Sequence, residues 1–277
     1  MDRVGLGAAI ESRLRAERES LRRQFGTPGR VNSCVLDDLL EPETCRAVHA
    51  AFPDPGTMML RKSLRERKYV SAQMDECAPL LEEAVYAFQQ PGVVDVLGEI
   101  SGVRDLMPDE HLYAGGVSAM GKGHFLNPHV DNSHDKDRRA YRVLNLLYYV
   151  TPDWQPEDGG SLQLWDEGPR RPGVRTLPSL FNRLVVMGTT RRSWHSVSPV
   201  TSDGIRCCVS NYYFAPRPLT TGSDEPGGDY FHPTSFRGFP GERLKDVVLR
   251  ADASLRAGVR RVRKGGLAPT RHVYKRS

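Results

Sequence analysis

Apolar residues occur in short runs over the middle of the chain, and turn residues separate these runs. The runs are 141–151 (YRVLNLLYYVT), 161–165 (SLQLW), 183–188 (RLVVMG) and 205–214 (IRCCVSNYYF). Each has the length and the β-branched and aromatic content of a strand. Many short strands with no long helix among them are typical of a double-sheet jelly roll. We therefore predict a mainly β fold with flanking helices and a jelly-roll core, also called a double-stranded β-helix.

Helical periodicity is confined to the two flanks of this β-rich region. In the Arg-rich stretch 8–24, Ile10, Leu14 and Leu21 give a thin apolar stripe, typical of a helix at the edge of a domain. A strand near 31–40 and a helix entered at Pro42 come next, and then two helices over 78–90 and 91–100. After a stretch rich in Pro and Gly that begins at 216, expected to be a surface excursion or a lid, a last helix is predicted over 244–264. Its expected apolar stripe contains Leu244, Val247, Val248, Ala251 and Leu255.

The length of 277 residues suits one principal domain with appendages. We expect an N-terminal basic helix over 1–30, a main domain over 31–217 with its jelly-roll core at about 111–217, and a C-terminal extension over 218–277. The sequence contains no run of about 20 apolar residues and no apolar leader, which argues against a membrane partner. Five cysteines, an odd number without CxxC spacing, are expected to be reduced in a cytoplasmic protein.

The charge balance is basic, with a net charge of +5 and a pI near 9.0. Much of the excess lies in the last thirty residues, but no aromatic residues interleave with it and no nucleic-acid motif accompanies it. A nucleic-acid partner is therefore not expected. A second basic run, RKSLRERK at 61–68, precedes a strand candidate at 69–74. It is either a charged loop or helix, or a basic wall beside a site.

The residues with most chemical interest are His129, Asp131 and His195, followed eleven residues later by Arg206. About one His-x-acid pair is expected by chance in a chain with this composition, so the pair alone is weak. Two imidazoles and one carboxylate nevertheless form the facial triad that holds Fe(II) with open positions. A solvated loop histidine is the alternative for His129, but the short strand-like segments that follow the pair and flank the second histidine favour the metal-binding interpretation.

Polar residues inside the predicted strands indicate a bound co-substrate. On an extended strand Asn145 and Tyr149 share one face, and on another Arg206 and Ser210 share one. An arginine that points into a barrel is costly unless an anion meets it, and its planar fork suits a carboxylate. The alternatives are an ion pair for the arginine and a backbone-bonded core tyrosine.

Residues 111–217 resemble the Fe(II)/2-oxoglutarate-dependent oxygenases, most closely the prolyl-hydroxylase branch that includes the hypoxia-inducible-factor prolyl hydroxylases. The shared motifs are HVDN at 129–132, YY-x-x-x-DW at 148–154, GG-x-L at 159–162 and H-x-V-x-P at 195–199. The resemblance implies that His129, Asp131 and His195 bind Fe(II), and that Arg206 and Tyr149 bind the far carboxylate of 2-oxoglutarate. It further implies hydroxylation of an unactivated C–H bond by O2 with release of succinate and CO2; ascorbate stays open as an additional cofactor.

The chain departs from that branch at Leu126, where a tyrosine is frequent, and in a longer loop before Arg206. The type of primary substrate therefore does not transfer from the resemblance. Desaturation and cyclisation also stay open. Basic clusters at 61–68 and 191–192 favour an anionic substrate, which is a small molecule, carrier-linked or peptidyl. Candidate substrate contacts are Arg65, Asn132, Arg192 and Trp194. The alternatives are a non-catalytic jelly-roll metal-binding protein and a cupin-like metalloenzyme without 2-oxoglutarate. Nothing in the sequence predicts the oligomeric state.

Overall fold

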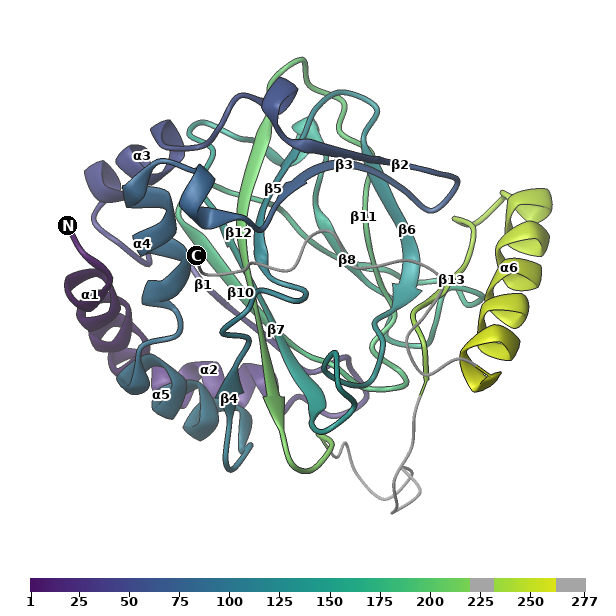
Figure 1. Cartoon of the computed structure of the whole chain (residues 1–277), viewed down its shortest axis with the longest axis horizontal. Helices are drawn as coiled ribbons and strands as arrows, with labels where there is room; N and C mark the ends of the chain where they lie inside the picture. The colour runs from purple at the N-terminus through teal and green to yellow at the C-terminus, as the bar shows by residue number, and fades with distance from the viewer. Residues whose placement is uncertain (220–231, 263–277) are drawn as a thin grey trace.

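A curled antiparallel sheet forms the centre of the molecule (Figure 1), in a computed structural model that describes residues 1–219 and 232–262. Its strands are β1 (Ser33–Leu36), β2 (Met59–Lys62), β3 (Glu66–Ser71), β4 (Met107–Pro108), β5 (Gly116–Met120), β6 (Phe125–Val130), β7 (Tyr141–Tyr149), β8 (Leu162–Leu164), β9 (Arg175–Leu177), β10 (Arg183–Gly188), β11 (His195–Val197), β12 (Arg206–Ala215) and β13 (Ser235–Phe236). The main path of the sheet is β1-β10-β7-β12-β5-β3-β6-β11-β8-β9. The predicted jelly-roll core is confirmed.

Helices flank the sheet on two sides. They are α1 (Arg3–Ala16), α2 (Arg18–Phe25), α3 (Pro42–Ala50), α4 (Pro79–Ala87), α5 (Pro91–Ser101) and α6 (Arg243–Val262), with short 3-10 turns at Pro55–Thr57, Met74–Glu76 and Pro156–Asp158. The N-terminal helices gather on one side of the sheet, and α6 lies alone on the opposite side (Figure 1). Three of them, α3, α4 and α5, begin with a proline at their first position, where the missing N–H costs no hydrogen bond.

Strand β3 joins the two halves of the jelly roll. Its C-terminal part pairs with β5 through Tyr69–Ser71, and its N-terminal part pairs with β6 through Glu66 and Arg67. The sheet therefore continues from the half that packs on the helices into the half that contains β6, β11 and β8. This continuity places the inner faces of β6, β7, β11 and β12 around one interior space.

The central strand β7 separates the hydrophobic core from this interior space. Leu144, Leu146 and Tyr148 join the large core cluster beneath the helices, and the Tyr148 ring centroid lies 5.6 Å from that of Phe88. Tyr149, on the other face, belongs to a smaller cluster inside the roll. From Leu144 to Tyr149, the two faces of β7 are thus divided as the alternation of the sequence predicts.

Several elements differ from their predicted form. The single N-terminal helix is two helices that meet at Glu17, and its stripe lies in the main core rather than on a solvated edge. The basic run 61–68 is neither loop nor helix: it forms most of a β-hairpin with Lys62 paired to Arg67. In α6 the part of the stripe whose side chains are described faces solvent, with Leu244 86% exposed, and among residues 243–254 Leu249 is the buried one. The helix therefore packs through a different face.

Two compositional predictions can be compared with the described residues. All five cysteines are free thiols, as their number and spacing predict. Within the described residues, no helix has the length and apolar character to cross a membrane. The basic C-terminal tail falls mainly in 263–277, outside the described residues.

Candidate active site

Two adjacent strands bring His129 and His195 together. In the pairing of β6 with β11, His195 lies directly opposite His129, and the two ring centroids are 4.0 Å apart. Cross-strand partners share one face of a sheet, so both rings point into the interior space. The residues are 4% and 3% exposed, respectively, which excludes bulk water from most of both rings.

Backbone carbonyls fix the tautomer of both imidazoles. The Nδ1 of His129 lies 2.9 Å from the carbonyl oxygen of Asn127, and the Nδ1 of His195 lies 2.9 Å from that of Ser193. Because a carbonyl oxygen can only accept, each Nδ1 must carry the proton and donate it. Each Nε2 is left with a free lone pair, the form in which histidine binds metals.

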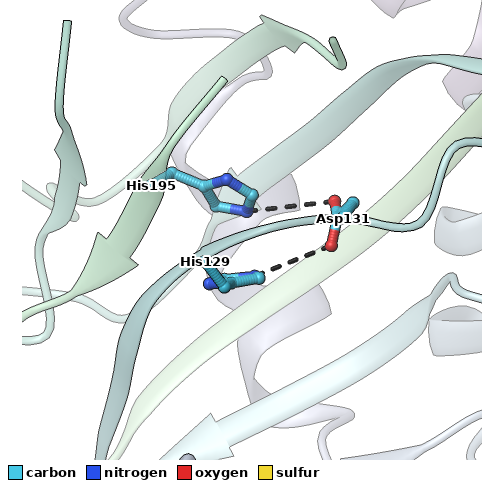
Figure 2. Close-up of side chains that lie close together, drawn as sticks. All are labelled: His129, Asp131 and His195. Carbon is cyan, nitrogen blue, oxygen red and sulfur yellow. Dashed lines mark ion pairs between the residues drawn. The ribbon is translucent and has the colours of Figure 1, made fainter. Parts of the chain in front are cut away.

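Both of these Nε2 atoms face the carboxylate of Asp131, which follows the last residue of β6. The distances are 3.6 Å from His129 Nε2 to Oδ1 and 3.9 Å from His195 Nε2 to Oδ2, too long for hydrogen bonds (Figure 2). One ligand atom from each of the three residues lies within 4.8 Å of the others. This spacing and chemistry suit a single divalent cation with two nitrogen ligands and one oxygen ligand.

The protonation states of these residues favour metal binding. Burial opposes the charged form of Asp131, but the neighbouring imidazoles and the Arg142 guanidinium outweigh it and hold the carboxyl pKa below its ordinary value. Burial, together with His129, lowers the pKa of His195 to about 4. At neutral pH the cluster therefore contains a carboxylate and a neutral His195 imidazole.

Arg142 is a buried cation beside the cluster that the sequence analysis did not identify. Its Nη1 lies 3.8 Å from Oδ2 of Asp131, and its guanidinium carbon lies 4.5 Å from the Tyr212 ring centroid. Strict alternation would place Arg142 on the face of β7 that packs against the helices, together with Leu144. A register shift on β7 between Leu144 and Arg142 turns it inward, opposite Phe214 of β12.

Arg206 and Tyr149 form a second polar pair in the interior. Arg206 is 4% exposed, and within the described residues its guanidinium donates hydrogen bonds to the Gly160 carbonyl at 3.4 Å and to the Met120 sulfur at 3.3 Å. No carboxylate among the described residues forms an ion pair with Arg206, so the ion-pair alternative for it is not supported. The Tyr149 hydroxyl, Arg206 Nε and Asn145 Oδ1 have no hydrogen-bonding partner in the described parts of the chain. Burial raises the pKa of Tyr149 to about 12, so its hydroxyl is a donor.

These unsatisfied atoms show what the site is suited to bind. A buried polar atom without a partner is costly, and a bound anion next to Arg206 and Tyr149 would remove that cost. The Oδ2 atom of Asp131 also has no hydrogen-bonding partner within the described ranges. The residues thus fit a cation at the triad and a carboxylate at the Arg206–Tyr149 pair.

A cavity of about 460 Å³ connects the triad with this pair. It is lined by nine of the eleven residues proposed from the sequence, and Arg192 and Trp194 are the two that do not line it. The nine are Arg65, His129, Asp131, Asn132, Asn145, Tyr149, His195, Arg206 and Ser210.

Other cavity residues escaped the sequence analysis. Glu66 lines the cavity from β3, beside Lys68 of the basic run that was expected to form a wall beside a site, and the Lys68 ammonium lies 3.2 Å from the Glu66 carboxylate. Phe236 and Asp252 line it from β13 and α6. Glu66 could have been identified from the sequence, because a single glutamate inside the basic run 61–68 predicts ion pairs with its neighbours. Phe236 lies in a Pro- and Gly-rich stretch and gave no such signal.

Comparison with known proteins supports the fold and the family. Residues 115–214 match the family model described as the 2OG-Fe(II) oxygenase superfamily. Over 84 residues the chain is 39% identical to prolyl 3-hydroxylase OGFOD1 of Xenopus laevis, a match that covers 29% of this chain and 16% of that relative. The chain therefore matches much less than two thirds of that relative's length.

Solved structures have the same fold at low sequence identity. A prolyl-4-hydroxylase from Pseudomonas putida aligns with a TM-score of 0.53 at 18% identity, covering 72% of this chain and 99% of that one. A prolyl hydroxylase from Trichoplax adhaerens, in complex with a peptide fragment of the hypoxia-inducible-factor oxygen degradation domain, aligns with a TM-score of 0.50 at 20% identity. That alignment covers 74% of this chain and 91% of the other.

The matched segment contains both histidines, the aspartate, Tyr149 and Arg206. Members of the matched family use Fe(II), 2-oxoglutarate and O2, and the buried His-Asp-His cluster and the unpaired arginine fit these cofactors. Over residues 115–214, this chain is thus similar to the 2OG-Fe(II) oxygenase superfamily.

Proposed function

We propose that this protein is an Fe(II)- and 2-oxoglutarate-dependent dioxygenase that hydroxylates an unactivated C–H bond. In the overall reaction, one atom of O2 enters the substrate as a hydroxyl group. The other enters succinate, and CO2 is released from 2-oxoglutarate. The observation that carries the proposal is the pair of free, converging Nε2 atoms of His129 and His195 around the Asp131 carboxylate. A buried, unpaired arginine in the same cavity strengthens it.

Fe(II) would be held by His129 Nε2, His195 Nε2 and one carboxylate oxygen of Asp131. Three protein ligands leave coordination positions for 2-oxoglutarate and O2, as an open catalytic site requires. When bound, Fe(II) supplies the activation of O2 that is coupled to decarboxylation of 2-oxoglutarate. The protein contributes orientation, charge and the exclusion of water.

Arg206 and Tyr149 would bind the distal carboxylate of 2-oxoglutarate, with Asn145 and Ser210 as further polar contacts. A guanidinium fork can donate two parallel hydrogen bonds to a carboxylate, and the Tyr149 hydroxyl can donate a third. This arrangement favours 2-oxoglutarate chemistry over a cupin-like enzyme, because a cupin needs no such anchor. It also favours catalysis over a purely structural metal site, since a structural site needs no adjoining cavity.

The charges at the cavity mouth bear on the primary substrate. Arg61 and Lys68 pair with Glu66, and Arg65 pairs with Asp252, so the mouth carries one net positive charge from these five residues. Burial opposes ionisation of Glu66, but Lys68 and Arg61 hold its pKa below the ordinary value, so it offsets them at neutral pH. We therefore propose a substrate with a single anionic group rather than a polyanion.

Peptidyl and small-molecule substrates both fit this mouth. The matched relatives are named as prolyl hydroxylases, and one is in complex with a peptide fragment. Proline-containing peptides are therefore the first class to test, followed by free and carrier-linked metabolites with a carboxylate or phosphate. Ascorbate is included as an optional reductant in each assay.

The test is a substrate screen measured as succinate formation in the presence of Fe(II) and 2-oxoglutarate. We expect wild-type protein to form succinate in response to at least one substrate class, and His195→Ala to form none. Hydroxylation is then confirmed by a mass increase of one oxygen in the substrate. Turnover that persists in His195→Ala, or that requires no 2-oxoglutarate, would exclude the proposed reaction.

A further inference from the structure

The segment that follows residue 231 returns to the metal-binding strand. Strand β13 pairs with β6, with Ser235 opposite Val130 and Phe236 opposite His129. The Arg237 N–H donates to the Pro128 carbonyl at 2.7 Å and extends this pairing. Nearer the start of β6, at Phe125 and Leu126, strand β3 pairs with the same edge. Without β13, the backbone of β6 around His129 would present an unpaired sheet edge.

The pairing register places three side chains in one cross-strand row. His129 has His195 opposite it on β11 and Phe236 opposite it on β13. Directly opposed residues share one face of a sheet, so Phe236 lies on the same face as the two histidines. Consistent with this, Phe236 lines the cavity that contains the triad.

Phe236 packs on the imidazole of His129 itself. The two ring centroids are 5.0 Å apart and the ring planes differ by 14°, which is a stacked arrangement. The Nδ1–H···O bond to Asn127 fixes one edge of the His129 ring, and the stacked phenyl ring fixes its plane. Both restraints leave the Nε2 edge free to bind a ligand.

The same segment is tied to the loop that follows Asp131. The Ser133 N–H donates to the His232 carbonyl at 3.1 Å, and the His232 N–H donates to the Ser133 hydroxyl at 2.9 Å. These two hydrogen bonds lie two residues beyond the carboxylate. The segment 232–237 therefore restrains the chain on both sides of the His129–Asp131 pair.

We propose that Phe236 is a positioning residue of the metal centre, holding the His129 imidazole in its ligating orientation through β13. This inference rests on the proposed function, because it assigns the metal to the triad. It extends the centre beyond residues 115–214 to a strand outside the segment that the family model matches. Residues that orient a metal ligand typically contribute about 10–100-fold to metal affinity.

The test is metal binding, measured without turnover. Co(II) is titrated into metal-free wild type, Phe236→Ala, Phe236→Tyr and Phe239→Ala, and its visible ligand-field spectrum is recorded. Phe239 is a matched control because it lies three residues further along the chain, is also half-buried, and does not line the cavity. Circular dichroism at the titration temperature verifies that each metal-free variant is folded.

We expect Phe236→Ala to bind Co(II) about tenfold or more weakly with an altered spectrum. Phe236→Tyr keeps the aromatic ring and should resemble wild type, as should Phe239→Ala. An unchanged affinity and spectrum in Phe236→Ala would overturn the inference, even if its melting temperature falls, because that result assigns Phe236 a structural role only. Failure of His129→Ala to weaken Co(II) binding would instead overturn the metal assignment on which the inference rests.

Discussion

Arg206 and Tyr149 face each other inside the jelly roll, with the guanidinium carbon 5.2 Å from the centroid of the phenol ring. Strand β12 pairs with β7 so that Cys208 lies opposite Tyr149, which brings the side chain of Arg206, two residues earlier, to the same inner face. Since no acidic partner neutralises Arg206 in the described residues, the pair is suited to an anion that enters from the cavity.

The first prediction concerns this anchor. Arg206→Ala should raise the 2-oxoglutarate concentration needed for half-maximal turnover by at least about 30-fold, since truncating one partner of a buried charge pair costs about 2–5 kcal/mol. The KM for the primary substrate should change much less. Tyr149→Phe should act in the same direction but more weakly, because it removes one neutral donor.

Arg206→Lys serves as the control for charge alone. It keeps the cation but loses the planar fork, so its affinity for 2-oxoglutarate should lie between those of wild type and Arg206→Ala. An unchanged requirement for 2-oxoglutarate in Arg206→Ala would mean that the anchor lies elsewhere.

The second prediction concerns the protonation of His195 in the metal-free protein. Burial, with the neighbouring His129, lowers its pKa to about 4, so its ring should remain neutral at pH 5.5. Side-chain NMR titration measures this directly. A midpoint near the ordinary value of about 6.5 would contradict the buried, desolvated environment.

A stability consequence follows from the same shift. Between pH 6.5 and about 4 the unfolded chain binds a proton at this position that the folded chain does not. The free energy of unfolding is therefore unaffected by this group above pH 6.5. It decreases as the pH falls towards 4, by at most about 3 kcal/mol. Wild type should show a steeper loss of unfolding free energy over this range than His195→Asn. Equal slopes would count against the prediction.

The third prediction concerns the ion pair between Arg65 of the β2–β3 hairpin and Asp252 of α6. Asp252→Ala frees a cation at the cavity mouth and should lower the KM for an anionic substrate, whereas Arg65→Ala should raise it. Both effects should shrink as salt is added, because the pair is partly exposed. Arg192 does not line the cavity, so Arg192→Ala should have a smaller effect than Arg65→Ala.

The exposed pair of Lys122 and Asp203 provides the matched control for these charge changes. Lys122→Ala also removes a cation from an ion pair, but neither residue of that pair lines the cavity, so it should leave the KM unchanged. Equal effects of Lys122→Ala and Arg65→Ala would show that net charge, rather than the cavity mouth, controls the KM.

The alternation of the strands allowed much of the site to be predicted. On β7 it assigned Asn145 and Tyr149 to the interior, and on β12 it assigned Arg206 and Ser210 to it; all four line the cavity. It failed at Arg142, because a register shift on β7 reverses the face of that residue. Local pattern does not encode a bulge, which depends on the partner strand.

Two further elements depend on tertiary contacts that no local pattern reveals. The run 61–68 is too charged to resemble a strand, yet it becomes a hairpin because β3 is hydrogen-bonded by β5 and β6. Strand β13 has only two residues and forms because the edge of β6 accepts it. Phe236 was therefore invisible to the sequence analysis, although the register places it beside His129.

The most direct test of the central claim is an anaerobic titration of Fe(II) into the protein with 2-oxoglutarate present. A 2-oxo acid that chelates Fe(II) gives a visible charge-transfer band, so the titration reports the metal and the co-substrate together. In wild type we predict a band that saturates at one Fe(II) per chain. In Asp131→Ala we predict either no band or an affinity for Fe(II) that is at least about tenfold weaker. No band in wild type, or an identical titration in Asp131→Ala, would contradict the assignment of Fe(II) to His129, Asp131 and His195.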